Sequence, residues 1–261
     1  MKNRIRNLLV IASSLVTRFL VPKNFTRVIA MHEVPMEKKE EFRRKMIWLK
    51  NNFPNVVLTF DDGFKCFYTT IFPVLKELNM PATFFIPSGA IGLQGEKAHI
   101  FIKENLRRTS FLDDFLTESQ LKEIADSNLI TIGGHTTNHI DCGKSYTEEE
   151  WKKEIVDDKK KLEEIIGKEI TDFAFPFGAK TNTSSQAVEK ISQAGYKRAF
   201  SIVPGFTSLG VMNPKGYILQ GNSSKFWVSR DSLTLAESDV VWSAWLSGGY
   251  DWVVKLKDKI K

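Results

Sequence analysis

The chain has little cysteine: Cys66 and Cys142 are far apart in 261 residues and form no CxxC pair. A disulfide scaffold and a four-ligand zinc site are therefore not expected, and both thiols are interpreted as inert. The sequence also lacks a dense Lys/Arg cluster interleaved with aromatic residues, and its formal charge of +6 is spread over the whole length. This excludes nucleic acid as the expected partner and leaves a mild preference for anionic surroundings such as phospholipid headgroups.

No internal repeat, low-complexity stretch or convincing linker divides the chain. Its length suits one large α/β domain or two small ones, and the absence of a linker favours one. From Val28 onward, short apolar runs alternate with helical patterns, which is typical of a β/α-repeating fold. We therefore expect an α/β architecture in which residues 25–261 form a single domain.

The N-terminal segment, residues 1–24, lacks an apolar run long enough to span a bilayer comfortably, because Arg18 interrupts it. It opens with Lys2, Arg4 and Arg6 and then becomes apolar at three- and four-residue steps, which predicts an amphipathic helix. The apolar positions are Ile5, Leu8, Leu9, Ala12, Leu15, Val16, Phe19 and Leu20. Such a helix can pack on the domain or lie on a membrane surface. A cleaved signal, for which no clear small-x-small site follows, and an uncleaved anchor are the other readings.

Short apolar runs bounded by turn residues predict six strands. They cover residues 27–32, 55–60, 81–87, 129–135, 170–178 and 198–203. Capping boxes at Thr117 and Thr147 predict the starts of two helices, the second running to Ile166 with Gly167 as its C-terminal cap. Further helices are expected over residues 66–78, despite Pro73, over residues 184–195 and near the C-terminus from Val240. Residues 88–115 have weak periodicity and are interpreted as a substrate-facing insertion with a short helix.

Polar or turn-forming residues follow four of these strands where each ends. They are His32, the pair Asp61-Asp62, His135 and the segment Phe175–Gly178. Active sites of barrel-like and doubly wound α/β folds are assembled at the carboxyl ends of the strands, so these groups are expected to converge there.

The segment GGHTTNHI has the spacing of a metal site. His135 and His139 are four residues apart, which in a helical turn or tight loop puts both imidazoles on one side. With one carboxylate they would make a three-ligand site with open positions for water and substrate. The alternative is one histidine in a cap or core and the other on the surface. The Asp-Asp-Gly at another strand end favours the metal site.

The adjacent carboxylates in TFDDG can then have different roles. A cation bound to Asp62 offsets the repulsion between the neighbours and lowers the pKa of its water toward ~7. Asp61 is left free to act as general base, while the metal polarises the carbonyl that is attacked. Gly63 lets the chain turn away at once and leaves the site open.

The motifs TFDDG, HTTNH and FAFPFG, in this order and spacing, resemble the polysaccharide deacetylases, the NodB-homology group of carbohydrate esterase family 4. The resemblance covers about residues 28–230. It implies a distorted (β/α)7 barrel as the catalytic domain, and metal-dependent removal of an acetyl group from an N-acetylated sugar. The implied cofactor is a divalent ion, usually zinc, which other divalent ions can replace. The family's first motif assigns the base to the first aspartate and the metal to the second, in agreement with Asp61 and Asp62.

The sequence departs from the family pattern at the third motif. Ala174 stands where an arginine usually braces the base, so another residue must orient Asp61, and Arg230 in VSRDSL is the candidate. The alternative interpretation is that Arg230 is an ordinary arginine on the protein surface. Pro176 and Phe177 remain, and they imply a groove wall and a backbone N–H at Phe177 for the oxyanion.

Two further family features are missing. No histidine follows His139, so the C-terminal Leu-x-His that usually supplies the general acid is absent. Some relatives have instead an early strand that ends in histidine, and VIAMHEV is similar to it. His32 would then protonate the leaving amine, with Glu33 tuning it; a structural or substrate-binding histidine is the alternative. No aromatic motif completes the groove, although Trp227 could serve.

The sequence thus predicts a metal-dependent deacetylase of an N-acetylated glycan or lipid-linked saccharide. Hydrolysis of a non-sugar amide or of an O-acetyl ester by the same ligands is one alternative, and a glycan-binding homologue without catalysis is another. The basic amphipathic N-terminus predicts peripheral membrane association or a place in the cell envelope, with the cytoplasmic and exported sides both open.

Overall fold

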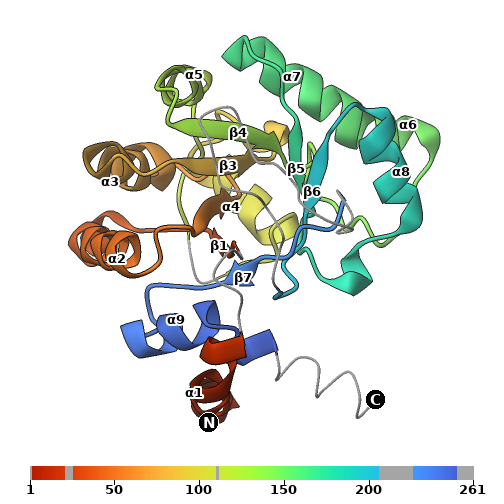
Figure 1. Ribbon diagram of the computed structural model, residues 1–261. Helices are drawn as coiled ribbons and strands as arrows, with labels where there is room; N and C mark the ends of the chain where they lie inside the picture. Colours follow the sequence, from red (N-terminus) through yellow and green to blue (C-terminus); the bar gives the residue numbers. More distant parts are fainter. Residues whose placement is uncertain (1, 21–25, 110–111, 206–225, 252–261) are drawn as a thin grey trace.

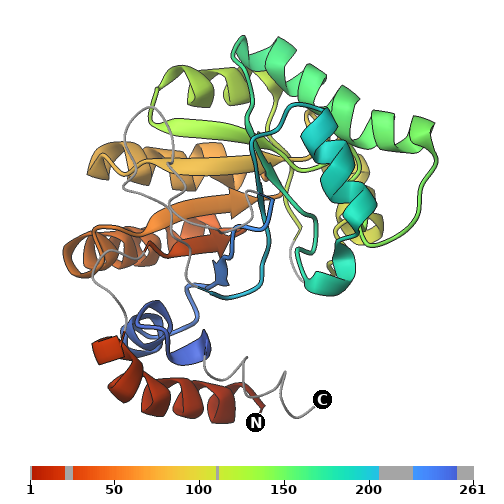
Figure 2. The ribbon, with the colours of Figure 1, turned by 45° about the vertical axis from the view of Figure 1, so that its right-hand side comes forward.

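The computed structural model describes residues 2–20, 26–109, 112–205 and 226–251 (Figure 1). Within them, seven parallel strands form one sheet in the order β6-β5-β4-β3-β2-β1-β7. They are β1 (Val28–Met31), β2 (Val57–Asp61), β3 (Ala82–Ile86), β4 (Ile130–Gly134), β5 (Asp172–Ala174), β6 (Arg198–Phe200) and β7 (Asp231–Ser232). Helices surround the curled sheet (Figures 1 and 2). The expected distorted (β/α)7 barrel is confirmed, and each of the six predicted strands is present.

The helices include several whose starts the sequence predicted. They are α1 (Lys2–Leu20), α2 (Lys39–Asn52), α3 (Phe72–Leu78), α4 (Gly95–Glu104), α5 (Glu118–Asp126), α6 (Glu148–Trp151), α7 (Asp157–Ile166), α8 (Ser185–Gln193) and α9 (Asp239–Leu246). Both capping boxes are confirmed, since the hydroxyls of Thr117 and Thr147 accept the N–H three residues on and each Gln or Glu reaches back. Gly167 ends α7 with φ +69°, a conformation that suits glycine.

Pro73 does not interrupt a single α-helix, because the chain changes helix type just before it. Residues Phe67–Ile71 form a π-helical turn, and α3 starts at Phe72, so Pro73 is the second residue of α3. The chain is helical without a break over residues 66–78, and the wider π-helical turn lies directly before the proline, which has no N–H to donate to that turn. The sequence predicted one helix over residues 66–78, whereas the structure has these two joined segments.

The segment Val228–Ser232 connects the two edges of the curled sheet. Val228 bridges to Phe200 of β6, and β7 pairs with β1. The N–H of Val228 donates to the Ala199 carbonyl at 2.8 Å, and the Val228 carbonyl accepts from the Ser201 N–H at 2.8 Å. Arg230, in the middle of this segment, is thereby placed inside the curl of the sheet.

Two apolar clusters lie on the two faces of the sheet. The larger one fills the space between the sheet and the helices. The smaller one lies inside the curl and consists of Val28, Val57, Phe85, Ala174, Phe200 and Val228. Strand side chains alternate between the faces, so Thr59 and Asp61 point to the same inner face as Val57. This alternation places one of the two adjacent aspartates inside the curl.

Helix α1 lies at the margin of the molecule, beside α9 and away from the sheet (Figures 1 and 2). No helix in the described ranges is both long and apolar enough to cross a membrane. The helix expected near the C-terminus from Val240 is present as α9, and the residues after Asp251 lie outside the described ranges. The boundary placed between residues 24 and 25 falls there too and stays a prediction.

A buried arginine joins the start of β1 to the end of the chain's described part. Arg27 donates to both carboxylate oxygens of Asp251, at 3.1 and 2.8 Å, and lies 3.2 Å from Asp231. It also donates to the carbonyls of Trp245 and Leu246. Burial raises the pKa of Asp231 to about 7, although the nearby Arg27 charge opposes this.

Arg27→Met is expected to destabilise the fold by roughly 3–5 kcal/mol, because it leaves two carboxylates buried without their cation. Urea unfolding followed by circular dichroism measures this. Arg43→Met is the matched control: the Arg43–Glu77 pair is exposed, and its loss should leave the urea unfolding midpoint close to that of the wild type. Equal unfolding midpoints for the two variants would contradict the structural role of Arg27.

Candidate active site

The groups predicted at the strand ends meet in one pocket at the carboxyl edge of the sheet. Its volume is about 100 Å³. The lining residues are His32, Asp61, Asp62, Leu106, Arg108, His135, His139, Phe175, Phe177, Ile202 and Arg230. The pocket therefore brings together residues at the ends of β1, β2, β4 and β5 with Arg230 of the segment Val228–Ser232, although these parts lie far apart in the sequence.

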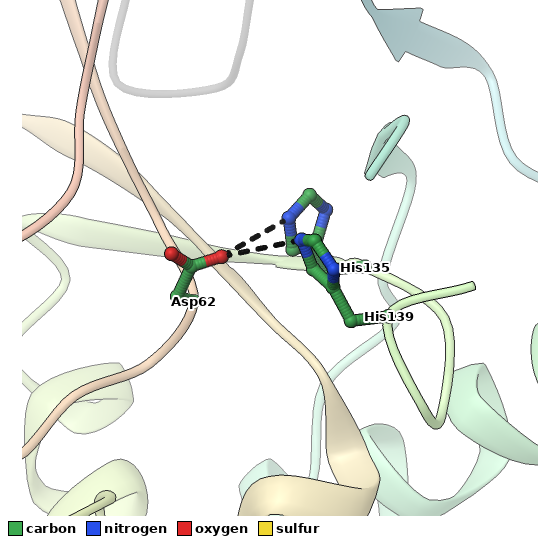
Figure 3. Close-up of side chains that lie close together, drawn as sticks. All are labelled: Asp62, His135 and His139. Atoms are coloured by element: carbon green, nitrogen blue, oxygen red, sulfur yellow. Dashed lines mark ion pairs between the residues drawn. The ribbon is translucent and has the colours of Figure 1, made fainter. Parts of the chain in front are cut away.

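Asp62, His135 and His139 direct one donor atom each toward a common point (Figure 3). The Asp62 Oδ1 atom lies 3.6 Å from His135 Nε2 and 3.4 Å from His139 Nε2. The three donor atoms lie within 4.8 Å of one another, and all three side chains are buried. One carboxylate and two imidazoles are a ligand set that zinc and related divalent ions accept.

Backbone carbonyls orient both imidazoles. His135 Nδ1 lies 2.7 Å from the Ala174 carbonyl, and His139 Nδ1 lies 3.2 Å from the Asn105 carbonyl. A carbonyl only accepts, so each Nδ1 carries the hydrogen and each Nε2 keeps its lone pair free. Metal-ligating histidines are typically held in this way. The residues present therefore fit a divalent metal.

The loop between the two histidines is fixed by buried acidic side chains of the following helical segment. Glu154 accepts from the Asn138 backbone N–H at 2.8 Å and from its side-chain amide at 2.6 Å. Asp158 accepts from the backbone N–H groups of Ser88 and His135, at 2.9 and 3.3 Å. These contacts hold both ends of the HTTNH loop, so the separation of the two imidazoles is set by the fold.

Strained backbone is concentrated at this site. Asp62, Thr136, His139 and Phe177 have φ values of +86°, +60°, +52° and +60°. They are four of the seven non-glycine residues with positive φ among those described. Each such residue stores roughly 1–3 kcal/mol of strain, which persists only where the surrounding structure enforces it. This pattern is typical of a functional site.

Asp61 is held by Arg230. The guanidinium donates to Asp61 Oδ1 and Oδ2, both at 2.7 Å, and its remaining groups bind Thr59 Oγ1 at 2.9 Å and the Ser201 carbonyl at 2.8 Å. Burial alone would raise the pKa of Asp61, but the charge and hydrogen bonds of Arg230, together with the nearby imidazoles, hold the pKa below its usual value. Ala174, where the family usually has an arginine, belongs to the same inner cluster over which Arg230 lies.

Asp62 turns away from Asp61 and faces the histidines. Its φ of +86° and that of Gly63, +73°, reverse the chain direction immediately after β2. A Cβ on Gly63 would lie 3.1 Å from the Ile86 side chain, so the turn leaves little room for another residue. Burial would raise the pKa of Asp62, but the two imidazoles that face it and the charge of Arg108 hold the pKa well below its usual value. The two neighbouring carboxylates thus have separate cationic or hydrogen-bonding partners.

His32 lies at the end of β1, half-buried in the wall of the pocket. The loss of hydration lowers the pKa of its imidazole, against the opposing effect of the Asp62 carboxylate. The adjacent Glu33 binds Arg108 at 2.6 Å, and Arg108 lies 3.0 Å from Asp62 Oδ2. His32 therefore shares the pocket with the metal-site residues, as the sequence predicted.

The remaining predicted residues, Phe177, Pro176 and Trp227, differ in whether they line the pocket. Phe177 lines the pocket, and its ring packs edge-on against His139 at 4.7 Å. Its backbone N–H makes no hydrogen bond to another of the described residues. Pro176 is buried behind Phe177, and Trp227 packs on Phe175 at 6.1 Å; neither is among the residues that line the pocket.

Sequence reasoning missed Leu106, Arg108 and Ile202 as pocket residues. Leu106 and Arg108 come from the segment of residues 88–115 that was interpreted as substrate-facing, so its location was predicted but not these side chains. The guanidinium of Arg107 lies 4.5 Å from the Phe177 ring and is exposed. Nothing in the local pattern distinguishes these arginines from the other surface cations of the chain.

Comparison with known proteins identifies the family of the chain. A family model described as polysaccharide deacetylase matches residues 49–199, more than half of the chain. The chain is 31% identical over 153 residues to the YxkH protein of Bacillus subtilis strain 168, whose name refers to the same family; the match covers 59% of this chain and 46% of YxkH. It is 25% identical over 194 residues to the poly-beta-1,6-N-acetyl-D-glucosamine N-deacetylase of Escherichia coli K12, covering 64% of this chain and 28% of that enzyme. The chain thus spans less than half the length of these two curated relatives.

A solved structure has the same fold. BC0361, a polysaccharide deacetylase from Bacillus cereus, superposes with a TM-score of 0.63 at 19% identity, covering 85% of this chain and 69% of that one. The family match includes the segments that carry Asp61, Asp62 and both metal-site histidines. The chain belongs to the polysaccharide deacetylase family, the NodB-homology group of carbohydrate esterases.

Proposed function

We propose that the protein is a metal-dependent deacetylase that hydrolyses the acetamido group of N-acetylated sugars in a glycan. The observation that carries this proposal is the separation of the two adjacent aspartates. The donor atoms of Asp62, His135 and His139 lie within 4.8 Å of one another, while Asp61 is bound by Arg230 in the same pocket. The relatives named poly-beta-1,6-N-acetyl-D-glucosamine N-deacetylases support a polymer of N-acetylglucosamine as the substrate class.

Asp62, His135 and His139 would hold the divalent ion, with zinc as the first candidate. When bound, such an ion acts as a Lewis acid on the acetyl carbonyl and favours deprotonation of water at neutral pH. The donor atoms of the three side chains already lie within 4.8 Å of one another. Open space on the pocket side of this point, lined by His32 and Phe177, would receive the acetamido group.

Asp61 would accept the proton of the attacking water. Arg230 keeps it ionised and orients both of its oxygens, and each oxygen retains a further lone pair. The backbone N–H of Phe177 would donate to the oxyanion that forms on the acetyl carbonyl. His32 would deliver a proton to the leaving sugar nitrogen, and its lowered pKa makes its protonated form a stronger acid.

Exchanging each aspartate separately tests the division of roles. Asp61→Asn is expected to lower acetate release from N-acetylglucosamine oligomers by about 10²–10⁴-fold while one zinc per chain still binds. Asp62→Asn is expected to weaken zinc binding by more than ~100-fold and to abolish release as well. Zinc is measured on the purified protein by mass spectrometry, and acetate by an enzyme-coupled assay.

Asp126→Asn, an exposed position on α5, is the control and should behave like the wild type in both assays. The division of roles is wrong if Asp61→Asn turns over at the wild-type rate, or if Asp62→Asn keeps full zinc occupancy.

Arg230→Lys tests how Asp61 is held. Lysine cannot make the two parallel hydrogen bonds, so the pKa of Asp61 should rise. Because Asp61 acts as a carboxylate, the acid limb of kcat/KM should move to higher pH, with kcat reduced about 10–100-fold and zinc occupancy unchanged. Arg198→Lys, which weakens the buried Arg198–Asp172 pair outside the pocket, is the matched control. An acid limb that stays in place in Arg230→Lys would exclude this role for Arg230.

His32→Gln tests the proposed general acid through the leaving group. Release of acetate from an amide should fall about 10²–10³-fold, because the sugar nitrogen leaves only when protonated. Release from 4-nitrophenyl acetate should fall far less, since 4-nitrophenolate leaves without a proton. Equal losses on the two substrates would show that His32 acts elsewhere in the reaction.

A further inference from the structure

Helix α1 packs on the protein with its more polar face. Arg6 lies 5.5 Å from the Trp245 ring and 3.7 Å from Glu237, and Ser13 Oγ donates to the Gly249 carbonyl at 2.5 Å. Val10 is fully buried at the centre of this contact. A Cβ on Gly249 would lie 2.4 Å from the Val10 carbonyl, so the helix backbone is seated directly on this glycine. These contacts fix the rotation of α1 about its own axis.

The opposite face of α1 is apolar and exposed. We define the outer stripe as Ile5, Leu8, Leu9 and Leu15, which are 55%, 67%, 54% and 57% exposed. Their spacing of three and four residues puts them on one side of the helix, together with exposed Ala12. Four of the nine exposed large hydrophobic residues in the described part of the chain belong to this one helix.

A surface helix of a globular protein normally turns its apolar side to the core, and α1 does the reverse. Burial of the apolar side chains, which normally drives the packing of such a helix, is therefore not achieved for this stripe in the isolated chain. Single exposed apolar side chains are common on protein surfaces and need no explanation. A contiguous apolar stripe on one helix, in contrast, indicates a surface that is covered by a membrane or by another molecule.

The charge of this region indicates what covers it. The first acidic residue of the chain is Glu33, whereas Lys2, Arg4, Arg6 and Arg18 lie within the segment that forms α1. Apolar side chains on one face of a helix with basic residues and no acidic ones are the features of a helix that lies in the headgroup region of anionic lipid. An apolar protein groove would match the stripe but would not account for the one-sided charge.

We propose that α1 docks the protein on an anionic lipid surface, with the outer stripe at the boundary between headgroups and acyl chains. The domain remains attached through Val10, Ser13 and Gly249, so the helix can insert without leaving α9. This role is independent of the proposed deacetylation, because it uses no residue of the pocket.

Sedimentation of the full chain with vesicles tests the docking directly. The wild type is expected to bind vesicles of phosphatidylcholine with 40% phosphatidylglycerol, and to bind phosphatidylcholine alone at least tenfold more weakly. Each basic residue near an anionic surface contributes roughly fivefold, so 0.5 M NaCl should also weaken binding. Leu8→Ser/Leu15→Ser should weaken binding about 100-fold, because each buried leucine contributes on the order of tenfold.

Ile100→Ser/Leu112→Ser is the matched control, since these leucine-sized side chains are 49% and 55% exposed elsewhere on the surface. It should bind vesicles like the wild type, and both double variants should keep the wild-type circular dichroism spectrum. The proposal is overturned if the wild type does not bind the anionic vesicles, or if the two double variants bind equally. It is also overturned if analytical ultracentrifugation shows a dimer that Leu8→Ser/Leu15→Ser dissociates, because the stripe then serves a second copy of the chain.

Discussion

The pair formed by Arg230 and Asp61 links the closure of the fold to the chemistry of its pocket. The sheet is connected across its two edges by the short segment Val228–Ser232, and the middle residue of that segment reaches across the interior to the end of β2. The arginine satisfies four acceptors at once, and it is almost fully buried. Removal of one partner of such a pair destabilises a fold by roughly 3–5 kcal/mol, so the position of Asp61 is coupled to the integrity of the barrel.

This pair also explains how two ionised neighbours are tolerated at the end of a buried strand. Alternation along β2 directs Asp61 inward, and the left-handed turn at Asp62 and Gly63 directs the next carboxylate to the histidines. Each carboxylate then has its own arginine: Arg230 binds Asp61, and Arg108 lies beside Asp62, which also faces the two imidazoles. Backbone strain at four positions of the site is the structural consequence of this arrangement.

Much of the fold and the core of the site could be predicted from the sequence because their signals are local. Strands ending in polar residues, two capping boxes and the HxxxH spacing each depend on residues close together in the chain. The predicted pairing of Arg230 with Asp61 needed the family pattern, in which the arginine absent at Ala174 had to be replaced.

Arg108 could not be predicted, since its position depends on how a loop of weak periodicity folds over the pocket. The change of helix type before Pro73 was not predicted either, because the apolar pattern of residues 66–78 was interpreted as one helix and these residues are helical throughout. The orientation of α1 depends on a close backbone contact with Gly249, which hydrophobic periodicity alone would place on the opposite face.

The central claim is that one divalent ion is held by Asp62, His135 and His139, with Asp61 beside it but held by Arg230. A crystal of the protein grown with zinc, measured on both sides of the zinc absorption edge, tests this most directly. The account predicts a single strong anomalous peak within about 2.0–2.2 Å of one Asp62 oxygen and both Nε2 atoms, with Asp61 still bound to Arg230. A zinc ion bound by Asp61 in place of Asp62, or the absence of an anomalous peak between the three side chains, would contradict this metal site.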